Sequence, residues 1–336
     1  MSLKIGMVVD SYYPKDIRVR KEAESLALQN EVYVLCVRDK NQKEEETINN
    51  VHVYRLIEYK NSKVRGFLDM INSLWYIHPI FIKKLEEFVE KTNVEVLHVH
   101  DLPLAKTGYK IAKKHNLPAI LDLHENYPEA LKTWFIWRKS KVVRLKNKLF
   151  FNYKRWHSYE QGIIGKYDVI IAVVKEMKNR LVTKQRISPD KIVVVSNTEK
   201  KDFANVYKNI NSNVIGKFAD KFVISYVGGF GPHRGLDVAI EGMVEVSKQI
   251  KNAILLLVGP SNKDVREYLQ GIIDNNNLGE YVKIIESQPF NSVAGIMKMS
   301  DINIIPHVKN EHTNNTVPHK LFQILLSGET TFSVRL

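Results

Sequence analysis

"FVISYVGGFGPHRGLDVAIEG", residues 222–242, decides the fold. A short apolar run ends at Gly228, a glycine-rich turn follows, and a helical pattern begins near Leu236. A strand, a tight turn and a helix in this order form the repeating unit of a parallel α/β sheet. The turn also places backbone N–H groups and Arg234 where a phosphate could bind. The alternative interpretation is an ordinary tight turn with one exposed arginine.

The same unit recurs on both sides of this stretch. Many short runs are apolar throughout instead of alternating with polar residues, which is typical of strands that are covered on both faces. They include KIGMVV, EVYVLCV, VEVLHVH, PAILDLH, VIIAVV, KIVVVS, AILLLVG, VKIIES and INIIPH. Segments with helical periodicity separate most of them. The first half is therefore predicted to be a doubly wound α/β domain, and a polar stretch, residues 198–221, is the predicted linker.

We predict two Rossmann-like domains that face a cleft. The first covers residues 1–203 and the second covers residues 204–336. The chain ends in "LLSGETTFSVRL", which begins what would be a fifth strand of the second domain. We therefore expect the second domain to be incomplete.

Length and composition predict a folded cytoplasmic protein with an anionic partner. The 336 residues are 44% hydrophobic and 26% charged, which is near the average for globular proteins. The sequence shows no signal peptide, no apolar run long enough to span a bilayer, and a single cysteine, Cys36. The net charge of +13 favours nucleic acid, acidic lipid or a phosphorylated substrate. Specific nucleic-acid binding is not expected, because no known reading motif is present.

Two predicted strands end in polar residues, at the edge where ligands bind in open α/β sheets. In "HVHDLPLA" we predict that His98 and His100 point to opposite faces and do not share a metal ion, and that Asp101 caps the next helix. In "LDLHENYPEAL", Asp122 and His124 are predicted to share one face. His124 is then a candidate general base or a polar contact to a sugar, an acid or a phosphate. A structural role is the alternative.

A basic and aromatic segment covers residues 132–156, "KTWFIWRKSKVVRLKNKLFFNYKRW". Aromatic and cationic side chains on a helical stretch suit an anionic membrane surface. The alternatives are a solvated face with buried aromatic residues, or a surface that stacks on nucleic acid. The residues predicted to face a membrane are Trp134, Trp137, Arg138, Lys139, Lys141, Arg144, Lys146 and Lys148.

Taken together, these motifs resemble the retaining glycosyltransferases of family 4, which have the two-domain GT-B fold. The segments that carry the resemblance are YYPKDIRVRKEAESLA, HVHDLPLA, LDLHENYPEAL, YDVIIAVVKEMKNRL, VVVSN, YVGGFGPHRGLDVAIEG and NNTVPHKLFQILLSG. Their order and spacing extend over the chain to about Gly328. The resemblance implies that the C-terminal domain binds a nucleoside diphosphate sugar and that the N-terminal domain binds the acceptor.

The resemblance also implies a donor site in which several charged residues of the family are replaced. The family's glycine-rich turn usually carries an arginine and a lysine for the diphosphate, and here Gly229 and Arg234 stand at those positions. Lys320 is the candidate to compensate for Gly229, with Arg18 as a second candidate. Two glutamates of the family are replaced by amides, which can still hydrogen-bond sugar hydroxyls. The implied donor-binding residues are Gly228, Gly229, Arg234, Asn315, Thr316, Val317, Lys320 and Gln323.

On the acceptor side, the resemblance places His124 near the sugar and the acceptor. The implied acceptor-side residues are Asp16, Arg18, Asp101, Asp122, His124 and Glu125. Catalysis is assigned to His124, Arg234 and Lys320, with the two cations stabilising charge that develops on the leaving phosphate. The implied reaction retains the anomeric configuration and requires neither a metal ion nor another cofactor.

The leading hypothesis is therefore a glycosyltransferase that works at the inner face of the cell membrane. It would move a sugar from a nucleotide-sugar donor to a sugar or lipid-linked acceptor during synthesis of a surface polysaccharide or glycolipid. The alternative is a truncated, non-catalytic protein with the GT-B fold that serves as a binding partner. Gly229, Asn315 and Gln323 favour that alternative, because each replaces a charged residue of the family.

Overall fold

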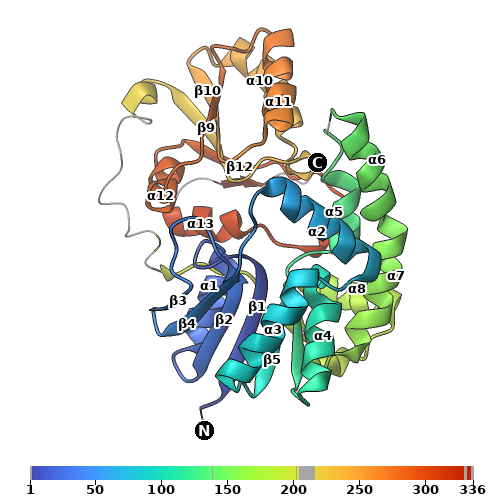
Figure 1. Ribbon diagram of the computed structural model, residues 1–336. Coiled ribbons are helices and arrows are strands. Elements are labelled where there is room, and N and C mark those ends of the chain that lie inside the picture. The colour runs from blue at the N-terminus through green and yellow to red at the C-terminus, as the bar shows by residue number, and fades with distance from the viewer. Residues whose placement is uncertain (1, 138, 202, 204–215, 329–330, 334–336) are drawn as a thin grey trace. The chain divides into compact units, whose positions relative to one another are not determined.

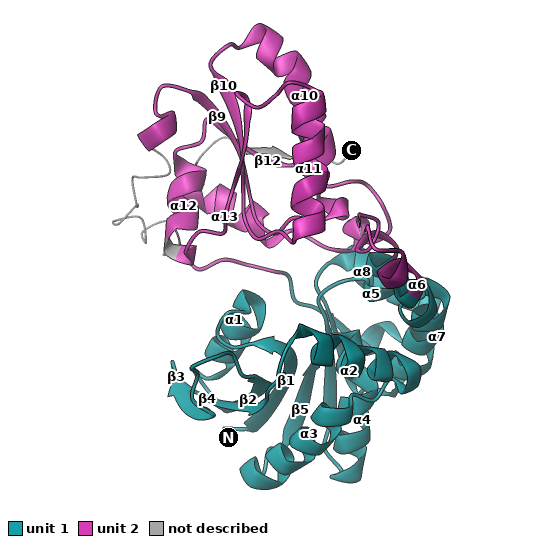
Figure 2. Ribbon diagram, turned by 45° about the horizontal axis from the view of Figure 1, so that its top comes forward, with its two compact units in different colours: residues 1–131, 146–196 teal, residues 132–145, 197–336 magenta. Residues whose placement is uncertain are grey.

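The computed structural model describes residues 2–137, 139–201, 203, 216–328 and 331–333 (Figure 1). These residues form two compact units, each built around its own sheet (Figure 2). Unit 1 comprises residues 1–131 and 146–196, and unit 2 comprises residues 132–145 and 197–336. The segment 132–145 therefore groups with unit 2, although the sequence division at 203/204 keeps it in the first domain.

Unit 1 contains an eight-stranded sheet in the order β3-β4-β2-β1-β5-β6-β7-β8. All neighbouring strands are parallel except β3 and β4. The strands are β1 (Lys4–Tyr12), β2 (Glu31–Val37), β3 (Glu45–Ile48), β4 (Val51–Ile57), β5 (Val96–His100), β6 (Ala119–Leu123), β7 (Val169–Ala172) and β8 (Ile192–Val194). The α-helices are α1 (Ile17–Leu26), α2 (Ser62–Trp75), α3 (Pro79–Thr92), α4 (Ala105–Lys114), α5 (Tyr127–Thr133), α6 (Lys141–Phe150), α7 (Tyr153–Ile163) and α8 (Lys175–Gln185). Short 3-10 helices cover Leu102–Leu104, Ile164–Lys166 and Pro189–Lys191.

Helices cover both faces of this sheet. On one face, Val19 and Ala23 of α1 pack in one buried cluster with Met7 of β1. On the other face, a side chain at Gly6 would meet Phe88 of α3. Burial on both faces explains why the strands are apolar throughout. Cys36 is buried in this core, and burial raises the pKa of its thiol to about 11.

Unit 2 contains a five-stranded parallel sheet in the order β11-β10-β9-β12-β13. The strands are β9 (Phe222–Val227), β10 (Ala253–Val258), β11 (Val282–Ile285), β12 (Ile302–Ile305) and β13 (Thr331–Ser333). The α-helices are α10 (Leu236–Gln249), α11 (Lys263–Asn275), α12 (Phe290–Lys298) and α13 (His319–Ser327). Short 3-10 helices cover Gly216–Phe218, Pro232–Arg234 and Thr313–Asn315.

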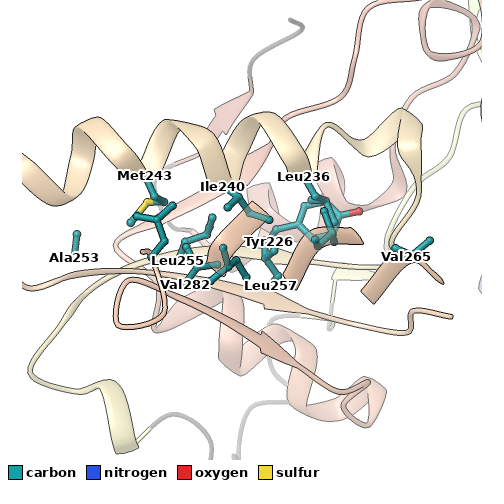
Figure 3. Packing of buried hydrophobic residues seen from close by; sticks show 12 residues of the cluster. Tyr226, Leu236, Ile240, Met243, Ala253, Leu255, Leu257, Val265 and Val282 are labelled. Atoms are coloured by element: carbon teal, nitrogen blue, oxygen red, sulfur yellow. The ribbon is translucent and has the colours of Figure 1, made fainter. Parts of the chain in front are cut away.

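Strand β10 shows how the core of unit 2 is built. All six of its residues are buried, and successive side chains point to opposite faces. Leu255 and Leu257 join the cluster formed with α10 and α11, where Tyr226 and Leu236 also lie (Figure 3). Leu256 instead joins a second cluster with α12 and α13. The quoted stretch 222–242 thus forms the predicted strand, turn and helix, and the α/β fold class is confirmed.

Close backbone approaches fix the turn after β9. Gly235 has φ +64°, and a Cβ atom there would lie 1.8 Å from the carbonyl oxygen of Pro306. The N–H of Val308 donates to the carbonyl of His233 (3.3 Å). Only glycine tolerates this conformation and this contact. The turn after β9 and the segment after β12 are therefore held together at one edge of the sheet.

The predicted linker, residues 198–221, lies partly outside the described residues, because 202 and 204–215 are not described. Within the described part of the chain, no helix combines the length and the apolar character that crossing a bilayer requires.

Candidate functional site

Strands β5 and β6 of unit 1 end side by side, with His100 paired in register with Asp122. The rings of His98 and His100 stack, with centroids 4.4 Å apart and planes inclined by 26°. The prediction that these two histidines point to opposite faces was therefore wrong. Side chains two residues apart on a strand share a face, so the period of two should have placed them together.

His124 lies at the centre of the polar cluster at these strand ends. Its Nδ1 is 3.4 Å from Oδ2 of Asp101, and its Nε2 is 3.5 Å from Oδ2 of Asp122. The Nε2 atom is also 3.4 Å from Nδ1 of His100, and Nε2 of His98 is 3.3 Å from Oδ2 of Asp122. The structure therefore brings His124, Asp101 and Asp122 together, as their predicted common role requires.

Asp101 has an unusual backbone conformation. Its φ of 66° and ψ of 150° fall in a region that residues other than glycine rarely adopt. The predicted capping hydrogen bond is not formed, although Asp101 does precede the 3-10 helix Leu102–Leu104. The carboxylate contacts His124 instead, and the backbone N–H donates to the carbonyl of Asp122 (2.8 Å). This strained residue is held in place by β6 and His124.

The electrostatics of the cluster favour a protonated His124. Burial disfavours the imidazolium, but Asp101 and Asp122 outweigh it and raise the pKa of His124 well above its ordinary value. Burial raises the pKa of Asp101, but His124 outweighs it and lowers that pKa to about 2. The imidazolium of His124 can donate hydrogen bonds to a sugar or phosphate, whereas a general base would first have to lose this proton.

Glu22 of α1 completes the cluster as a neutral carboxyl group. Burial, followed by repulsion from Asp122, raises the pKa of Glu22 to about 9. Its Oε2 lies 3.8 Å from Nδ1 of His100. The neutral carboxyl group can share its proton with Asp122, which is ionised. Glu22 is one of the residues that the sequence analysis missed.

The side chains of Glu22, His98, His100 and Asp122 could also hold a metal ion, since each offers one ligand atom and all four atoms lie within 4.8 Å of one another. Two His nitrogens and two carboxylate oxygens suit Zn²⁺ and similar transition metals. In the structure, however, the charges of Arg18 and His124 already oppose those of Asp101 and Asp122. A metal ion would have to displace the proton of Glu22.

Asp16 and Arg18 lie at the edge of the same cluster. Nε of Arg18 is 3.7 Å from Oδ1 of Asp16. Burial acts to lower the pKa of Arg18, but the negative charges of Asp16, Asp101 and Glu125 outweigh it. The pKa of Arg18 is therefore raised overall. Arg18 therefore has carboxylate partners within unit 1. Glu125 also has partners of its own and belongs to this group of charges.

Asp10, near the end of β1, is another acidic residue that the sequence analysis missed, in addition to Glu22. Oδ1 of Asp10 lies 3.0 Å from a guanidinium nitrogen of Arg65 and accepts a hydrogen bond from Tyr59 (3.3 Å). Burial nevertheless raises the pKa of Asp10 to about 7. A carboxyl group that titrates near neutral pH at a strand end is a candidate for proton transfer.

In unit 2, Lys320 occupies the first turn of α13 and is only 8% exposed. Its Nζ lies 3.5 Å from the ring centroid of Tyr226, and the described residues offer that amine no hydrogen-bond partner. A Cβ atom at Gly228 would lie 2.7 Å from Nζ, so a side chain there would compete for the same space. Burial, followed by repulsion from Arg234, lowers the pKa of Lys320 well below its ordinary value.

Arg234 lies beside Lys320 in the glycine-rich turn. Its NH1 group donates to Nε2 of His307 (2.9 Å), so the ring of His307 accepts through this nitrogen. The neighbouring Gly229 accepts a hydrogen bond from the hydroxyl of Tyr226 through its carbonyl (2.8 Å). No atom lies within 4 Å of a Cβ built at Gly229. The position where the family's arginine is expected is therefore open.

The two amides at the positions where the family resemblance implies glutamates, Asn315 and Gln323, are both buried. Nδ2 of Asn315 donates to the carbonyl of Glu311 (2.6 Å), and Nε2 of Gln323 donates to Oε2 of Glu199 (2.9 Å). The side chain of Glu199 is only 3% exposed and also lies 3.7 Å from His319. A carboxylate is thus present beside Gln323, but it comes from the segment after unit 1. The sequence analysis missed it because no local pattern links residues so far apart.

Thr316 and Val317 lie between the 3-10 helix Thr313–Asn315 and α13. The carbonyl of Val317 accepts a hydrogen bond from Nδ2 of Asn197 (3.1 Å). Pro318 precedes the helix as its N-cap without a capping side chain. The hydrogen bond from Asn197 therefore helps to fix the backbone just before α13. The N-terminus of a helix attracts anions.

The basic segment 132–156 does not expose all the residues that were predicted to face a membrane. Trp137 packs against the core of unit 2, with its ring 4.6 Å from that of Tyr268, and Trp134 is half-buried beside His312. Nζ of Lys139 lies 2.5 Å from Oε2 of Glu267. The prediction is corrected for Trp134 and Trp137, because composition does not distinguish an aromatic residue that is packed from one that is exposed, whereas Lys139 remains exposed beside Glu267.

The remaining cations of the segment lie on or beside α6. Lys141, Arg144 and Lys148 are exposed, whereas Lys146 is half-buried. Burial raises the pKa of Asp69, and the charges of Arg65 and Lys146 offset this rise only in part. Arg138 lies outside the described residues. Lys141, Arg144 and Lys148 of α6 are therefore exposed to a partner, as is Lys139 before this helix.

Comparisons with known proteins agree with this architecture. The family model described as Glycosyltransferase Family 4 matches residues 18–198, and the model described as Glycosyl transferases group 1 matches residues 207–314. The chain is 23% identical over 264 residues to the uncharacterized glycosyltransferase MJ1178 of Methanocaldococcus jannaschii, an alignment covering 78% of this chain and 61% of that protein. It is 20% identical over 300 residues to the alpha-monoglucosyldiacylglycerol synthase of Acholeplasma laidlawii, covering 84% and 69%.

Solved glycosyltransferases share the fold. Sucrose-phosphate synthase from Thermosynechococcus elongatus superposes with a TM-score of 0.73 at 16% identity, covering 98% of this chain and 81% of that one. HepE of Anabaena, solved in complex with UDP-glucose, superposes with a TM-score of 0.68 at 13% identity, covering 98% and 80%. The predicted GT-B fold class is thereby confirmed.

The neutral state of Glu22 predicts a pH-dependent effect of mutation. The pKa of Glu22 rises on folding, so its stabilising contribution is complete below about pH 4.5 and is lost as the pH rises to about 9. Glu22→Gln keeps a donor for Asp122 and removes this loss. We expect it to raise the free energy of unfolding by about 1–3 kcal/mol near pH 8 and by much less near pH 5.

Urea unfolding at several pH values measures this difference. Glu90→Gln on the exposed face of α3 is the matched control, and it should change stability by less than about 0.5 kcal/mol at every pH. A gain for Glu22→Gln that does not change between pH 5 and 9 would contradict the assignment of a neutral carboxyl group.

Proposed function

Since the chain belongs to glycosyltransferase family 4, we propose that it transfers a sugar from a nucleoside diphosphate sugar to an acceptor hydroxyl, with retention of configuration. The bond between the anomeric carbon and the β-phosphate oxygen breaks, and a bond from the same carbon to the acceptor oxygen forms on the same face. The proton of the acceptor passes to the leaving phosphate. The proposed reaction uses neither a metal ion nor another cofactor.

The observation that carries the proposal is the unpaired positive charge around Lys320. A buried ammonium without a partner is unfavourable, and burial, followed by repulsion from Arg234, holds the pKa of Lys320 well below its ordinary value. A diphosphate would give both cations charge-assisted hydrogen bonds, and the N-terminus of α13 would add its dipole. These groups would also stabilise the charge that develops on the leaving phosphate.

Glu199 and Gln323 are proposed to bind the nucleoside. Carboxylate and amide oxygens are suitable acceptors for the two ribose hydroxyls. The hydrogen bond from Gln323 to Glu199 fixes both groups and leaves Oε1 of the amide available. This arrangement returns the negative charge that the family's glutamate supplies at position 323. UDP-glucose in HepE supports a nucleoside diphosphate sugar as the donor class.

Unit 1 is proposed to bind the acceptor or the transferred sugar with the cluster around His124. Its imidazolium and the carboxylates Asp101 and Asp122 offer both donors and acceptors to hydroxyl groups. The cluster is held by internal contacts, including the strained backbone of Asp101. Such preorganisation is favourable for aligning a hydroxyl with the anomeric carbon.

A non-catalytic binding protein is the second candidate function. Gly229, Asn315 and Gln323 favour it, because each replaces a charged group that the family resemblance places at the donor site. Such a protein would still bind a nucleotide but would not release it from a nucleotide sugar. Measuring nucleoside diphosphate release next to binding separates the two candidates.

Lys320→Met tests the donor site. We expect affinity for nucleoside diphosphates to fall about 10- to 100-fold, because a hydrogen bond to a charged group is lost. The empty protein should become more stable by roughly 1 kcal/mol, because a partnerless buried amine is removed. Calorimetric titration with UDP, GDP and ADP and urea unfolding measure the two effects.

Lys248→Met, at an exposed position of α10, is the control and should change neither quantity. Unchanged nucleotide affinity in Lys320→Met would refute the placement of the diphosphate at this amine. No binding of any nucleotide by the unaltered protein would refute the proposed function itself.

Glu199→Ala tests the nucleoside half of the site. We expect the affinity for a nucleoside diphosphate to fall about tenfold, since a charged acceptor for a hydroxyl is lost. Affinity for inorganic pyrophosphate should not fall, because that ligand has no ribose. Glu245→Ala on the exposed face of α10 is the control. Equal losses for both ligands would show that Glu199 acts on the fold and not on the ribose.

We also propose that the protein works on an anionic membrane, in the synthesis of a surface polysaccharide or glycolipid. Helix α6 exposes an apolar stripe, because Val142, Leu145 and Leu149 are 78%, 60% and 57% exposed. They are spaced three and four residues apart and so share one face of the helix. Lys141, Arg144 and Lys148 flank this stripe, which suits a helix lying in the headgroup region.

Helix α2 adds a second exposed apolar face next to the end of α6. Phe67, Leu74 and Trp75 are 58%, 44% and 61% exposed. The hydroxyl of Ser73 donates to the carbonyl of Phe150, which brings the ends of the two helices together. The relative from Acholeplasma laidlawii, named for a glucosyl lipid product, supports a lipid-linked acceptor.

Unit 1 also contains a basic cavity, and one of its lining residues contacts α2. Its volume is about 860 Å³, and α3, α4 and α7 supply its walls. Nζ of Lys106, at one end, donates to the carbonyl of Trp75 in α2 (2.9 Å). The lysines that line it are Lys106, Lys110, Lys113, Lys114 and Lys166. This positive charge adds to the attraction of anionic headgroups.

Leu149→Glu tests the membrane surface. We expect partitioning onto phosphatidylglycerol vesicles to fall about tenfold or more, since burial of one leucine contributes about 1.5–3 kcal/mol. Leu28→Glu, at a position that is 79% exposed after α1, is the control and should bind normally. Sedimentation with phosphatidylglycerol and with phosphatidylcholine vesicles measures binding. Equal binding to both vesicle types, or unchanged binding of Leu149→Glu, would contradict the proposal.

A further inference from the structure

Three histidines gather around Arg234 in unit 2. His307 accepts the hydrogen bond from Arg234, and the ring of His233 lies 6.4 Å from that of His307 and 4.9 Å from that of His312. His233 comes from the turn after β9, and the other two come from the segment after β12. Since β9 and β12 are neighbours in a parallel sheet, these segments meet at the same edge.

The backbone holds this cluster in place. The close approach of Gly235 to Pro306 fixes the residue before His307 against the residue after Arg234. The hydrogen bond from Val308 to His233 joins the two segments a second time. His307 is only 7% exposed, and Nδ1 of His233 is buried without a hydrogen-bond partner among the described residues. The rings are therefore positioned by the fold and do not move freely in solvent.

The charged groups that face these rings are basic. Arg234, His312 and Lys320 act on the charge of His233. The same three residues and His233 act most strongly on the charge of His307. Burial comes first and repulsion from Arg234 second in lowering the pKa of each ring to about 2. Both rings are therefore neutral, because the groups that act on their charge among the described residues are basic.

We propose that His233 and His307 each take up a proton when a nucleoside diphosphate sugar binds and then donate hydrogen bonds to its phosphate oxygens, in place of an arginine at position 229. The inference rests on the proposed function, because it concerns the same donor site. Each phosphate of such a ligand carries one negative charge, which would favour an imidazolium nearby. The two imidazolium rings would thus supply the positive charge that an arginine at position 229 would carry and that Gly229 lacks.

Protonation of His307 would also free Arg234 for the ligand. A doubly protonated ring cannot accept the hydrogen bond that NH1 of Arg234 donates to Nε2. The guanidinium and the new N–H group of His307 would then both be available to phosphate oxygens. Binding of the donor and uptake of protons would therefore be one event, and donor affinity would fall as the pH rises.

Calorimetric titration with UDP-glucose tests the inference. The phosphates of this ligand do not titrate near neutral pH, so proton uptake reports the protein. Repeating the titration in buffers with different ionisation enthalpies counts the protons. We expect uptake of about one to two protons near pH 6.5 and roughly tenfold tighter binding at pH 6 than at pH 8.

The double variant His233→Gln/His307→Gln should take up about one to two protons fewer than the unaltered protein, because Lys320 can still take up its own, and should bind about tenfold more weakly at pH 6. Glutamine at 307 keeps an oxygen that can accept from Arg234, so the empty site retains this contact. His115→Gln, after α4 in unit 1, is the matched control and should behave as the unaltered protein. If the double variant melts early, His233→Gln alone, at the less buried position, gives an independent test.

Different failures have different meanings. Binding of UDP-glucose without proton uptake, or undiminished uptake in the double variant, would overturn the histidine inference and leave the proposed function standing. No binding of UDP-glucose, GDP-mannose, ADP-glucose or dTDP-glucose by the unaltered protein would overturn both.

Discussion

The buried amine of Lys320 against the ring of Tyr226 is the contact on which the organisation of unit 2 depends. It requires Gly228, since a side chain there would occupy the space of Nζ. It also places a second basic group near Arg234, and burial, followed by repulsion from Arg234, lowers the pKa of Lys320. A site with this imbalance is stable only while some of its basic groups stay deprotonated, and it gains most when an anion enters.

Unit 1 meets the same problem of buried charge in the opposite way. Around His124, positive and negative groups alternate, so that the imidazolium and the carboxylates stabilise each other without a ligand. This arrangement costs free energy at two other places. The backbone of Asp101 is strained, and the carboxyl group of Glu22 is kept neutral. The hydrogen-bonding groups of unit 1 thus stabilise one another, whereas the basic groups of unit 2 would gain charged partners from the proposed ligand. That division fits a protein whose donor is charged and whose acceptor is a hydroxyl group.

Local patterns predicted what local forces determine. The apolar run and glycine turn of residues 222–242 gave the correct strand and helix, and the polar strand ends identified His124 and Asp122. Contacts between distant residues could not be predicted, as Glu199 beside Gln323 and Glu22 beside Asp122 show. Trp137 illustrates the same limit, because its composition-based assignment to a surface ignored the core that it packs against. The wrong prediction that His98 and His100 point to opposite faces had a different cause. The two-residue period of a strand already places their side chains on one face.

The replaced residues of the donor site argue for a remodelled site more than for a decaying one. A site released from selection by loss of function would lose charges without regaining them at the same place in space. Here a carboxylate from residue 199 stands beside the amide at 323, and basic rings from 233 and 307 stand beside the arginine at 234. Gln323, His307 and the side chain of Glu199 are buried, whereas His233 and Arg234 are half-buried. Burying polar groups costs free energy unless they are paired. These contacts fit the proposal that other elements of the fold supply the groups that a charged, ribose-bearing ligand requires.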